Sequence, residues 1–151
     1  MSRMEPLLEV RALDPLRGRR TRVTWHDHAF SLEGDNHVAH GGASAGPDGF
    51  DLVAAALGQC LLNTLLAKAQ RDRKVVREAR AIVSTKTRLR GGGAAPHLSV
   101  LKVDIYLEGD LEEADRQSLE DWAREKCGVR ATLMQPPRIE ERVHLDGGQD
   151  A

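Results

Sequence analysis

The chain has 151 residues, of which 40% are hydrophobic and 30% are charged, enough for one globular domain with a buried core. Its 22 lysines and arginines nearly balance 23 aspartates and glutamates, which leaves a formal charge of -1. No strong overall charge therefore attracts nucleic acid or an anionic membrane, and we expect a small or neutral ligand.

The N-terminal part predicts a small antiparallel sheet. Residues 1–6 lack a basic segment followed by an apolar run, so we predict no secretory signal, a cytoplasmic protein and reduced thiols. Alternating apolar residues then predict strands over Leu7–Leu13 and Arg20–Trp25, and His28–Leu32 completes a meander. Gly34–Gly49 is rich in glycine, histidine and aspartate without a period, so it is predicted to be a loop.

The most apolar stretch, Phe50–Ala69, predicts a long helix of a soluble protein. Asp51, Gln59, Asn63 and Lys68 interrupt it, and such side chains are unfavourable at the centre of a bilayer. Almost no polar stripe remains, so the helix should be covered on every side. One chain of this size can hardly do that, and we therefore expect an obligate homodimer.

The second half predicts two long strands, a helix and a last strand. Strands are expected over Val75–Leu89 and Leu98–Leu107, with Gly91–Pro96 as a loose connector. Leu111–Lys126 has an apolar face and an acidic first turn, as in an amphipathic helix. Arg138–Leu145 is predicted to be a strand. The expected fold class is α+β, with one domain over residues 1–146 and a disordered tail over 147–151.

Two cysteines are the candidate reactive residues. Cys60 lies within the predicted buried helix, where a cysteine is as often an inert core residue as a reactive one. Cys127 follows the amphipathic helix, and the negative end of the helix dipole raises a thiol pKa. If one thiol attacks an oxidant, Cys60 suits the attack once a cation stabilises its thiolate. Cys127 then suits the resolving role, in which it condenses with a sulfenic acid to form a disulfide.

Two segments carry a family resemblance. The first segment resembles the signature of the OsmC/Ohr family of osmotically inducible and organic hydroperoxide resistance proteins. It comprises Gly41-Gly42, the run from Ala45 to Cys60, and Thr64-Leu65. Cys127-Gly128-Val129 with Thr132-Leu133 resembles the second cysteine motif of that family, which usually reads cysteine, proline, valine. The motifs occur in the family's order, and the resemblance spans nearly the whole chain.

The resemblance implies a fold, an activity and roles for particular residues. It implies sheets around paired central helices, an entangled homodimer, and sites at the dimer interface. It also implies reduction of organic hydroperoxides without a bound cofactor, with a dihydrolipoyl group or another dithiol as reductant. On this resemblance Cys60 is the peroxidatic residue and Cys127 the resolving residue.

The chain departs from the family pattern at two positions. The hydroperoxide reductases have a glutamate ten positions before the helix cysteine, paired with an activating arginine, whereas Phe50 stands there in this chain. Asp51 is the candidate catalytic carboxylate, but on a straight helix it would lie on the face opposite Cys60. Its alternative role is that of a first-turn acid that stabilises the helix N-terminus. Gly128 replaces the proline and loosens that turn.

A basic cluster could supply the activating cation, because a guanidinium stays charged and can hold both a thiolate and a peroxide oxygen. Surface arginines are more often only solvated, and the sequence does not choose among the four candidates, Arg17, Arg19, Arg20 and Arg22.

Three function classes remain open at this stage. The first is a thiol-dependent peroxidase. The second is a catalytically weak dimer of the same fold that binds or senses a small molecule, which Phe50 would allow. The third is a metal-binding protein that uses the histidines of the N-terminal half, His26, His28, His37 and His40.

Overall fold

The structure is a computed structural model that describes residues 8–13, 19–25, 30–88 and 95–144. Three strands form the N-terminal sheet in the order β1 (Leu8–Ala12), β2 (Thr21–Trp25) and β3 (Ser31–Gly34). Both pairings are antiparallel, and Val23 lies opposite Val10 on one side and Leu32 on the other. The predicted meander is confirmed, with β3 displaced toward the C-terminus by two to three residues from the predicted range.

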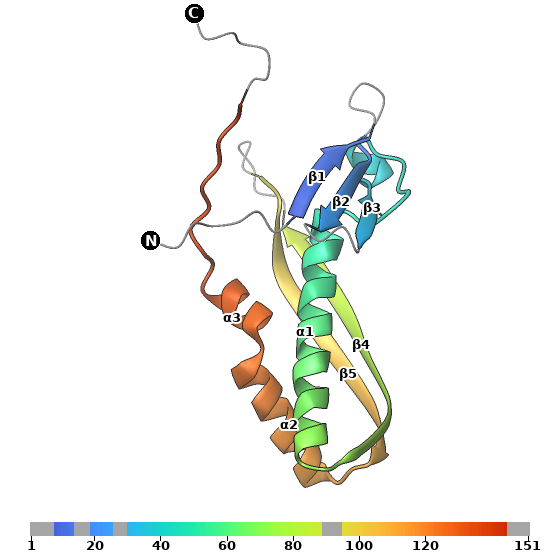
Figure 1. Cartoon of the computed structure of the whole chain (residues 1–151), viewed down its shortest axis with the longest axis vertical. Helices are drawn as coiled ribbons and strands as arrows, with labels where there is room; N and C mark the ends of the chain where they lie inside the picture. Colours follow the sequence, from blue (N-terminus) through green and yellow to red (C-terminus); the bar gives the residue numbers. More distant parts are fainter. Residues whose placement is uncertain (1–7, 14–18, 26–29, 89–94, 145–151) are drawn as a thin grey trace, which may run out of the picture.

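A second sheet consists of one long hairpin, β4 (Val75–Arg88) and β5 (His97–Asp110). The two strands pair antiparallel from Val75 opposite Asp110 to Arg88 opposite His97, with irregularities near the two ends. The hairpin runs along α1 (Gly49–Arg71) for most of the length of the helix (Figure 1).

A capping box fixes the start of α1. The Asp48 carboxylate accepts hydrogen bonds from the Phe50 and Asp51 N–H groups at 2.8 and 2.9 Å, and the Asp51 carboxylate accepts one from the Asp48 N–H. These bonds satisfy backbone donors that a helix N-terminus leaves free. By length and composition alone α1 could also cross a membrane, but apolar core helices of soluble proteins have the same properties.

Helix α2 (Glu113–Lys126) packs along α1, and α3 (Gly128–Met134) continues it after a break at Cys127 (Figure 1). The buried core between α1 and α2 consists of four apolar side chains: Leu65, Ala69, Leu119 and Ala123. Leu119 is only 2% exposed, so burial of this seam is the main apolar contribution that holds α2 against α1.

Only part of α1 is covered within a single chain. Its buried residues form one stripe that follows the helical period: Ala54, Leu57, Gly58, Leu65 and Ala69. The face that carries Ala55, Gln59 and Asn63 is exposed. One chain therefore leaves this helix incompletely covered, which is the condition from which the sequence analysis expected a homodimer.

The end of the chain differs from the sequence-based expectation. The predicted strand over Arg138–Leu145 is wrong for the single chain, because its described part, 138–144, has no strand assignment and Val143 is 92% exposed. An extended segment becomes a strand only when another strand satisfies its backbone groups, and the described residues provide none for it.

Helix α3 was not predicted. The predicted connector 91–96 and the tail 147–151 lie mostly or wholly outside the described residues.

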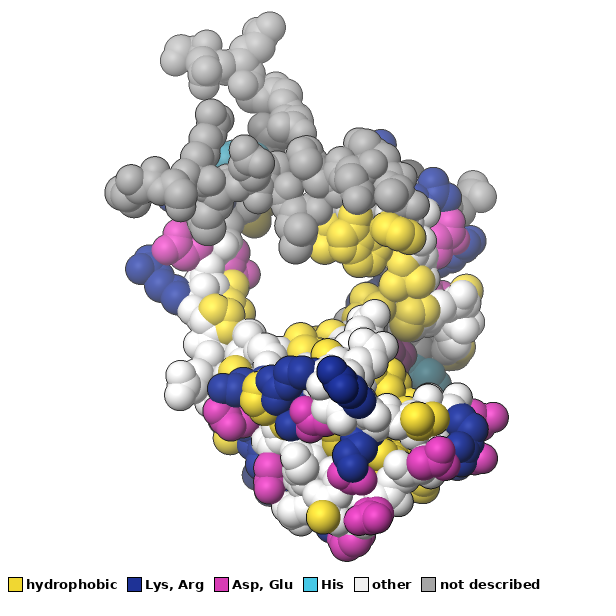
Figure 2. All heavy atoms as spheres, turned by 60° about the horizontal axis from the view of Figure 1, so that its bottom comes forward, with side chains coloured by type: hydrophobic (Ala, Val, Ile, Leu, Met, Phe, Trp, Pro, Cys, Tyr) yellow, Lys and Arg dark blue, Asp and Glu magenta, His cyan; other side chains and the backbone are white. Residues whose placement is uncertain are grey.

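The described surface carries both signs of charge. Lysine and arginine side chains alternate with aspartate and glutamate over the forward face of Figure 2. Many of them are paired at close range, as in the Arg116, Glu120 and Arg124 chain on α2. This mixture matches the near-neutral sequence, because neither sign dominates the visible face.

Candidate functional site

Helix packing brings the two cysteines into contact. Cys60 is in the middle of α1, and Cys127 is the residue between α2 and α3. Because α2 lies along α1, the two sulfurs approach to 2.9 Å although 67 positions separate them in the sequence. The Cys127 thiol donates a hydrogen bond to the Cys60 sulfur, and both residues are free cysteines in this structure.

The surroundings of Cys60 favour its thiolate. Burial raises its pKa, but four hydrogen-bond donors outweigh burial and leave the pKa below the ordinary thiol value. In decreasing order these donors are the Cys127 thiol, the Val129 N–H, the Thr64 hydroxyl and the Gly128 N–H. The Thr64 hydroxyl has only one proton and donates to the Cys60 carbonyl at 2.7 Å, whereas the Cys127 thiol contacts the Cys60 sulfur at 2.9 Å and is therefore the leading donor.

Cys127 is held as a neutral thiol. Its side chain is 1% exposed, and burial raises its pKa, as does the hydrogen bond that it donates to Cys60. The Arg130 N–H donates to its sulfur at 3.4 Å and acts in the opposite direction. The pKa is raised, as the sequence predicted, but burial is the leading cause and the dipole of α2 is not the explanation. Of the two sulfurs, Cys60 is therefore the one on which the thiolate is favoured, and Cys127 is the one on which the thiol is favoured.

Arg130 connects the two C-terminal helices across the break at Cys127. Its backbone N–H bonds the Cys127 sulfur, while its guanidinium donates to the Arg124 carbonyl oxygen at 3.0 Å. That carbonyl belongs to the last turn of α2, where oxygens lack partners within the helix. Arg130 thus holds α2 and α3 at a fixed angle, and this angle positions Cys127 beneath Cys60.

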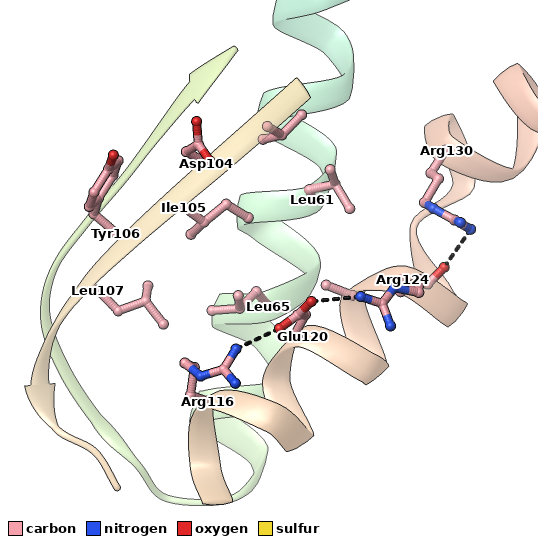
Figure 3. Close-up of a pocket in the computed structure, with 12 residues that line it drawn as sticks. Leu61, Leu65, Asp104, Ile105, Tyr106, Leu107, Arg116, Glu120, Arg124 and Arg130 are labelled. Atoms are coloured by element: carbon pink, nitrogen blue, oxygen red, sulfur yellow. Dashed lines mark hydrogen bonds and ion pairs between the residues drawn. The ribbon is translucent and has the colours of Figure 1, made fainter. Parts of the chain in front are cut away.

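Two pockets of about 430 Å³ each border α1 and β5, and neither is lined by a cysteine. The first, between α1, β5 and α2, has an apolar floor that includes Leu61 and Leu65 and a charged rim of Arg116, Glu120 and Arg124 (Figure 3). The second is mostly apolar, with Leu57, Leu98, Leu101, Leu133 and Met134 among its lining residues. Leu61, Val103 and Arg130 border both cavities.

Asp51 is not brought near the cysteines by the single chain. The helix runs unbroken from Gly49, so nine residues separate Asp51 from Cys60 by about 13 Å along the axis and about half a turn around it. Its carboxylate is occupied by the Asp48 N–H in the capping box. Phe50 is half-buried in the first turn of the helix. The described contacts of Asp51 are those of a helix-capping residue.

The candidate arginines lie at the N-terminal sheet. Arg20 and Arg22 bind the two carboxylate oxygens of Glu33, and the hydrogen bond from Arg22, followed by that from Arg20, lowers the pKa of this glutamate. The Arg19 side chain lies against Gly41 in the following loop. Arg17 lies outside the described residues. None of the described three forms a hydrogen bond with Cys60 within the described part of the chain, and the hydrogen bond to its sulfur comes from Cys127 at the α2–α3 junction.

The histidine candidates are only partly described. The His37 Nδ1 accepts a hydrogen bond from the Ala39 N–H at 3.2 Å and caps the short turn η1 (Val38–His40). The His37 and His40 rings lie edge to face, 6.5 Å apart. Within the described residues no three histidine, cysteine, aspartate or glutamate side chains gather as metal ligands, and His26 and His28 lie outside that part.

Comparison with known families agrees with this arrangement. The family model described as OsmC-like protein matches residues 40–142, from the loop before α1 to the segment after α3. The chain belongs to the OsmC-like family. Both cysteines fall within the matched region, as the sequence resemblance predicted. No curated protein matches the chain in sequence.

Solved structures have the same OsmC-like fold at low sequence identity. An osmotic stress induced and detoxification response protein from Psychrobacter arcticus aligns with a TM-score of 0.74 and 18% identity, covering 87% of this chain and 90% of its own. The organic hydroperoxide resistance protein OsmC from Legionella pneumophila aligns with a TM-score of 0.70 and 14% identity, covering 89% and 93%. An organic hydroperoxide resistance protein from Elizabethkingia anophelis aligns with a TM-score of 0.64 and 18% identity, covering 87% and 91%.

Sequence reasoning missed the residues that surround the sulfurs. Gly128 and Val129 act through backbone N–H groups, which leave no side-chain signature. Arg130 could have been noticed as a cation three positions after Cys127, the spacing of a first helical turn. Without a recognised helix after Cys127, that spacing had no structural meaning.

Proposed function

We propose that this OsmC-like protein reduces organic hydroperoxides, with Cys60 as the peroxidatic and Cys127 as the resolving residue. The observation that carries the proposal is the 2.9 Å contact between the two sulfurs, in which the pKa is lowered at Cys60 and raised at Cys127. A thiolate is the nucleophilic form of cysteine, and a neighbouring thiol is what a sulfenic acid needs to form a disulfide.

The reaction balances in three steps. The Cys60 thiolate attacks the terminal oxygen of the hydroperoxide, the O–O bond breaks, and Cys60 sulfenic acid and an alkoxide form. The alkoxide takes a proton and leaves as the alcohol. The Cys127 thiol then attacks the Cys60 sulfur, water leaves, and an intrachain disulfide forms. An external dithiol of the dihydrolipoyl type restores both thiols and becomes a disulfide itself.

The apolar cavities support the choice of an organic peroxide. The cavity lined by Leu57, Leu133 and Met134 borders Leu61, which follows Cys60 on α1. An apolar substituent of a peroxide could be buried in this pocket, whereas hydrogen peroxide would gain nothing from that surface.

The test uses the two cysteine variants. Cys60→Ser should abolish consumption of cumene hydroperoxide with dihydrolipoamide, because a serine hydroxyl stays protonated at neutral pH. Cys127→Ser should complete one turnover and then stall with Cys60 over-oxidised. After one equivalent of peroxide, peptide mass mapping should find a Cys60–Cys127 bridge within one chain. Wild-type protein that leaves hydroperoxide untouched with several dithiols contradicts the proposal.

A binding or sensing protein is the second candidate. It is favoured by Phe50 at the position of the usual glutamate and by the binding of Arg20 and Arg22 to Glu33. Both features leave Cys60 without a described cation. Slow alkylation of Cys60 at neutral pH, together with no peroxide turnover, would favour this candidate over the peroxidase.

We also propose that the protein is cytoplasmic and acts as an obligate homodimer. The dimer is supported by the incomplete cover of α1 and by large apolar side chains that are exposed in one chain, among them Val53, Met134 and Ile139. A second copy of the chain could bury both. Sedimentation at low micromolar concentration should give the dimer mass, and a stable folded monomer would contradict this part.

A further inference from the structure

The second of the two pockets has a single charge in an almost wholly apolar wall. Residues of α1, β5 and α3 form it, among them Leu57, Leu101 and Leu133. Of its lining residues in the described part of the chain, Arg130 is the only one that carries a charge, and Ser99 is the only other polar one. Ligand pockets commonly combine an apolar wall with a few polar groups that orient the ligand. The pocket therefore suits a ligand that is apolar along most of its length and polar at one end.

The charge of Arg130 is not paired with a carboxylate of the described residues. Arg116 and Arg124 both pair with Glu120, at 2.7 and 2.6 Å. The Arg130 guanidinium instead donates a hydrogen bond to a neutral group, the Arg124 carbonyl oxygen, at 3.0 Å (Figure 3). A guanidinium has five N–H donors, so others remain after this bond. Because Arg130 is half-buried, its charge is less well solvated than in open water, and a bound anion would stabilise it.

We propose that the second pocket binds an amphipathic organic anion, with the carboxylate of the ligand on the Arg130 guanidinium and its alkyl chain against the leucines. The planar guanidinium can donate two parallel hydrogen bonds to a carboxylate, which adds orientation to the attraction between the charges. A neutral molecule of the same length would gain only the apolar contacts, and an organic cation would be repelled. The inference goes beyond the proposed peroxidase function, because such an anion binds without reaction at either cysteine.

The first pocket suits this ligand less well. Asp104 and Glu120 lie in its wall together with three arginines, and Glu120 already pairs with two of them. A bound anion would have to compete there with a carboxylate of the chain itself. Arg130 borders both pockets, so it can hold the head group while the alkyl chain lies in the second pocket.

The first experiment compares three ligands of equal chain length on the wild-type protein without peroxide. In calorimetric titrations we expect octanoate to bind at least about tenfold more tightly than octan-1-ol, because only octanoate makes the charged contact. Octylamine should bind more weakly than octan-1-ol. Added salt should reduce the preference for octanoate, since screening weakens the attraction between charges and leaves the apolar contacts in place.

Substitutions then locate the contact. Arg130→Met removes the charge and keeps an apolar stem, so the affinity for octanoate should fall about tenfold while octan-1-ol still binds. The matched control is Arg124→Met, which removes a neighbouring charge but leaves the Arg124 carbonyl oxygen for Arg130, and it should keep the preference for octanoate. Leu133→Gln should weaken both ligands, because it replaces part of the apolar wall. In case methionine disturbs α3, Arg130→Gln removes the charge with a polar side chain and should show the same selective loss.

Each outcome decides the inference separately from the proposed function. Equal affinities of wild-type protein for octanoate and octan-1-ol overturn it, as does a full preference for octanoate in both neutral Arg130 variants. Wild-type protein that binds none of the three ligands overturns it too, and this result is expected if a second copy of the chain fills the pocket. If octanoate is preferred but hydroperoxide is not consumed, the anion site stands and the peroxidase function fails. Turnover of hydroperoxide without a preference for octanoate gives the reverse conclusion.

Discussion

Replacement of Gly58 tests how tightly α1 is held against the hairpin that supports Cys60. Gly58 is buried on α1, two residues before Cys60, and faces β4. A Cβ atom there would lie 2.7 Å from Val83 Cγ2, whereas ordinary contacts begin at 3.4 Å, so about 0.7 Å must come from movement of helix or strand. Val83 cannot easily turn aside, because a β-branched side chain is restricted at χ1.

Two opposing terms set the size of the effect. Alanine favours the helix over glycine by about 1 kcal/mol, whereas an extra methyl group in a packed contact costs about 1 to 3 kcal/mol. We therefore expect Gly58→Ala to lower the free energy of unfolding by about 1 kcal/mol. Movement of α1 should also disturb the contact of the Cys60 and Cys127 sulfurs, and alkylation of Cys60 at neutral pH should slow.

A double-mutant cycle with Val83→Ala isolates the clash. Urea unfolding of the four proteins should give the double variant about 1 to 2 kcal/mol more stability than the sum of the single changes predicts. Cys60 alkylation should return toward the wild-type rate. If Gly58→Ala alone is as stable as wild type or more so, Val83 adjusts at no cost, and the reasoning about a tight α1–β4 contact is wrong.

Three further predictions concern other described contacts. Leu119→Ala, in the buried seam between α1 and α2, should lower the free energy of unfolding by about 2 to 4 kcal/mol in urea titrations. Asp51→Asn keeps an acceptor for the Asp48 N–H but removes the charge, so peroxide turnover should be unchanged if Asp51 only caps α1 and should fall if it is catalytic. Asp35 is buried, and hydrogen bonds from the Ala43 and Ala45 N–H groups lower the pKa of its carboxyl group. The ionised carboxylate therefore stabilises the folded protein at neutral pH, and this contribution is lost as pH falls below the ordinary aspartate value of 3.8. The stability difference between wild type and Asp35→Asn should therefore shrink in acid, and a constant difference would contradict it.

Regular elements were predictable because their residues follow a simple period. The alternation in β4 and β5, and the apolar run of α1, depend on local sequence and on which face is buried. The capping box at Asp48 could also be recognised from an acid followed three residues later by another. The α+β class and the family follow from these elements and from the two cysteine motifs.

The rest of the site depends on contacts between distant segments. Helix α3 escaped prediction because its N-cap is Cys127, a residue type that seldom caps helices, where serine, threonine or aspartate is usual. The partners of Arg20 and Arg22 follow from the register of β2 with β3, which places Glu33 opposite Arg22. The donors to Cys60 follow from the packing of α2 and α3 on α1, and no local pattern encodes that approach.

The distance in sequence between the touching sulfurs has a thermodynamic consequence. A bridge between Cys60 and Cys127 would close a loop of 67 residues in the unfolded chain, which removes about 4 kcal/mol of chain entropy from that state. The oxidised protein should therefore melt well above the reduced protein. By linkage, the same free energy makes the bridge harder to reduce in the folded chain than in the unfolded one, so the fold itself helps to set the reduction potential that a dithiol must overcome.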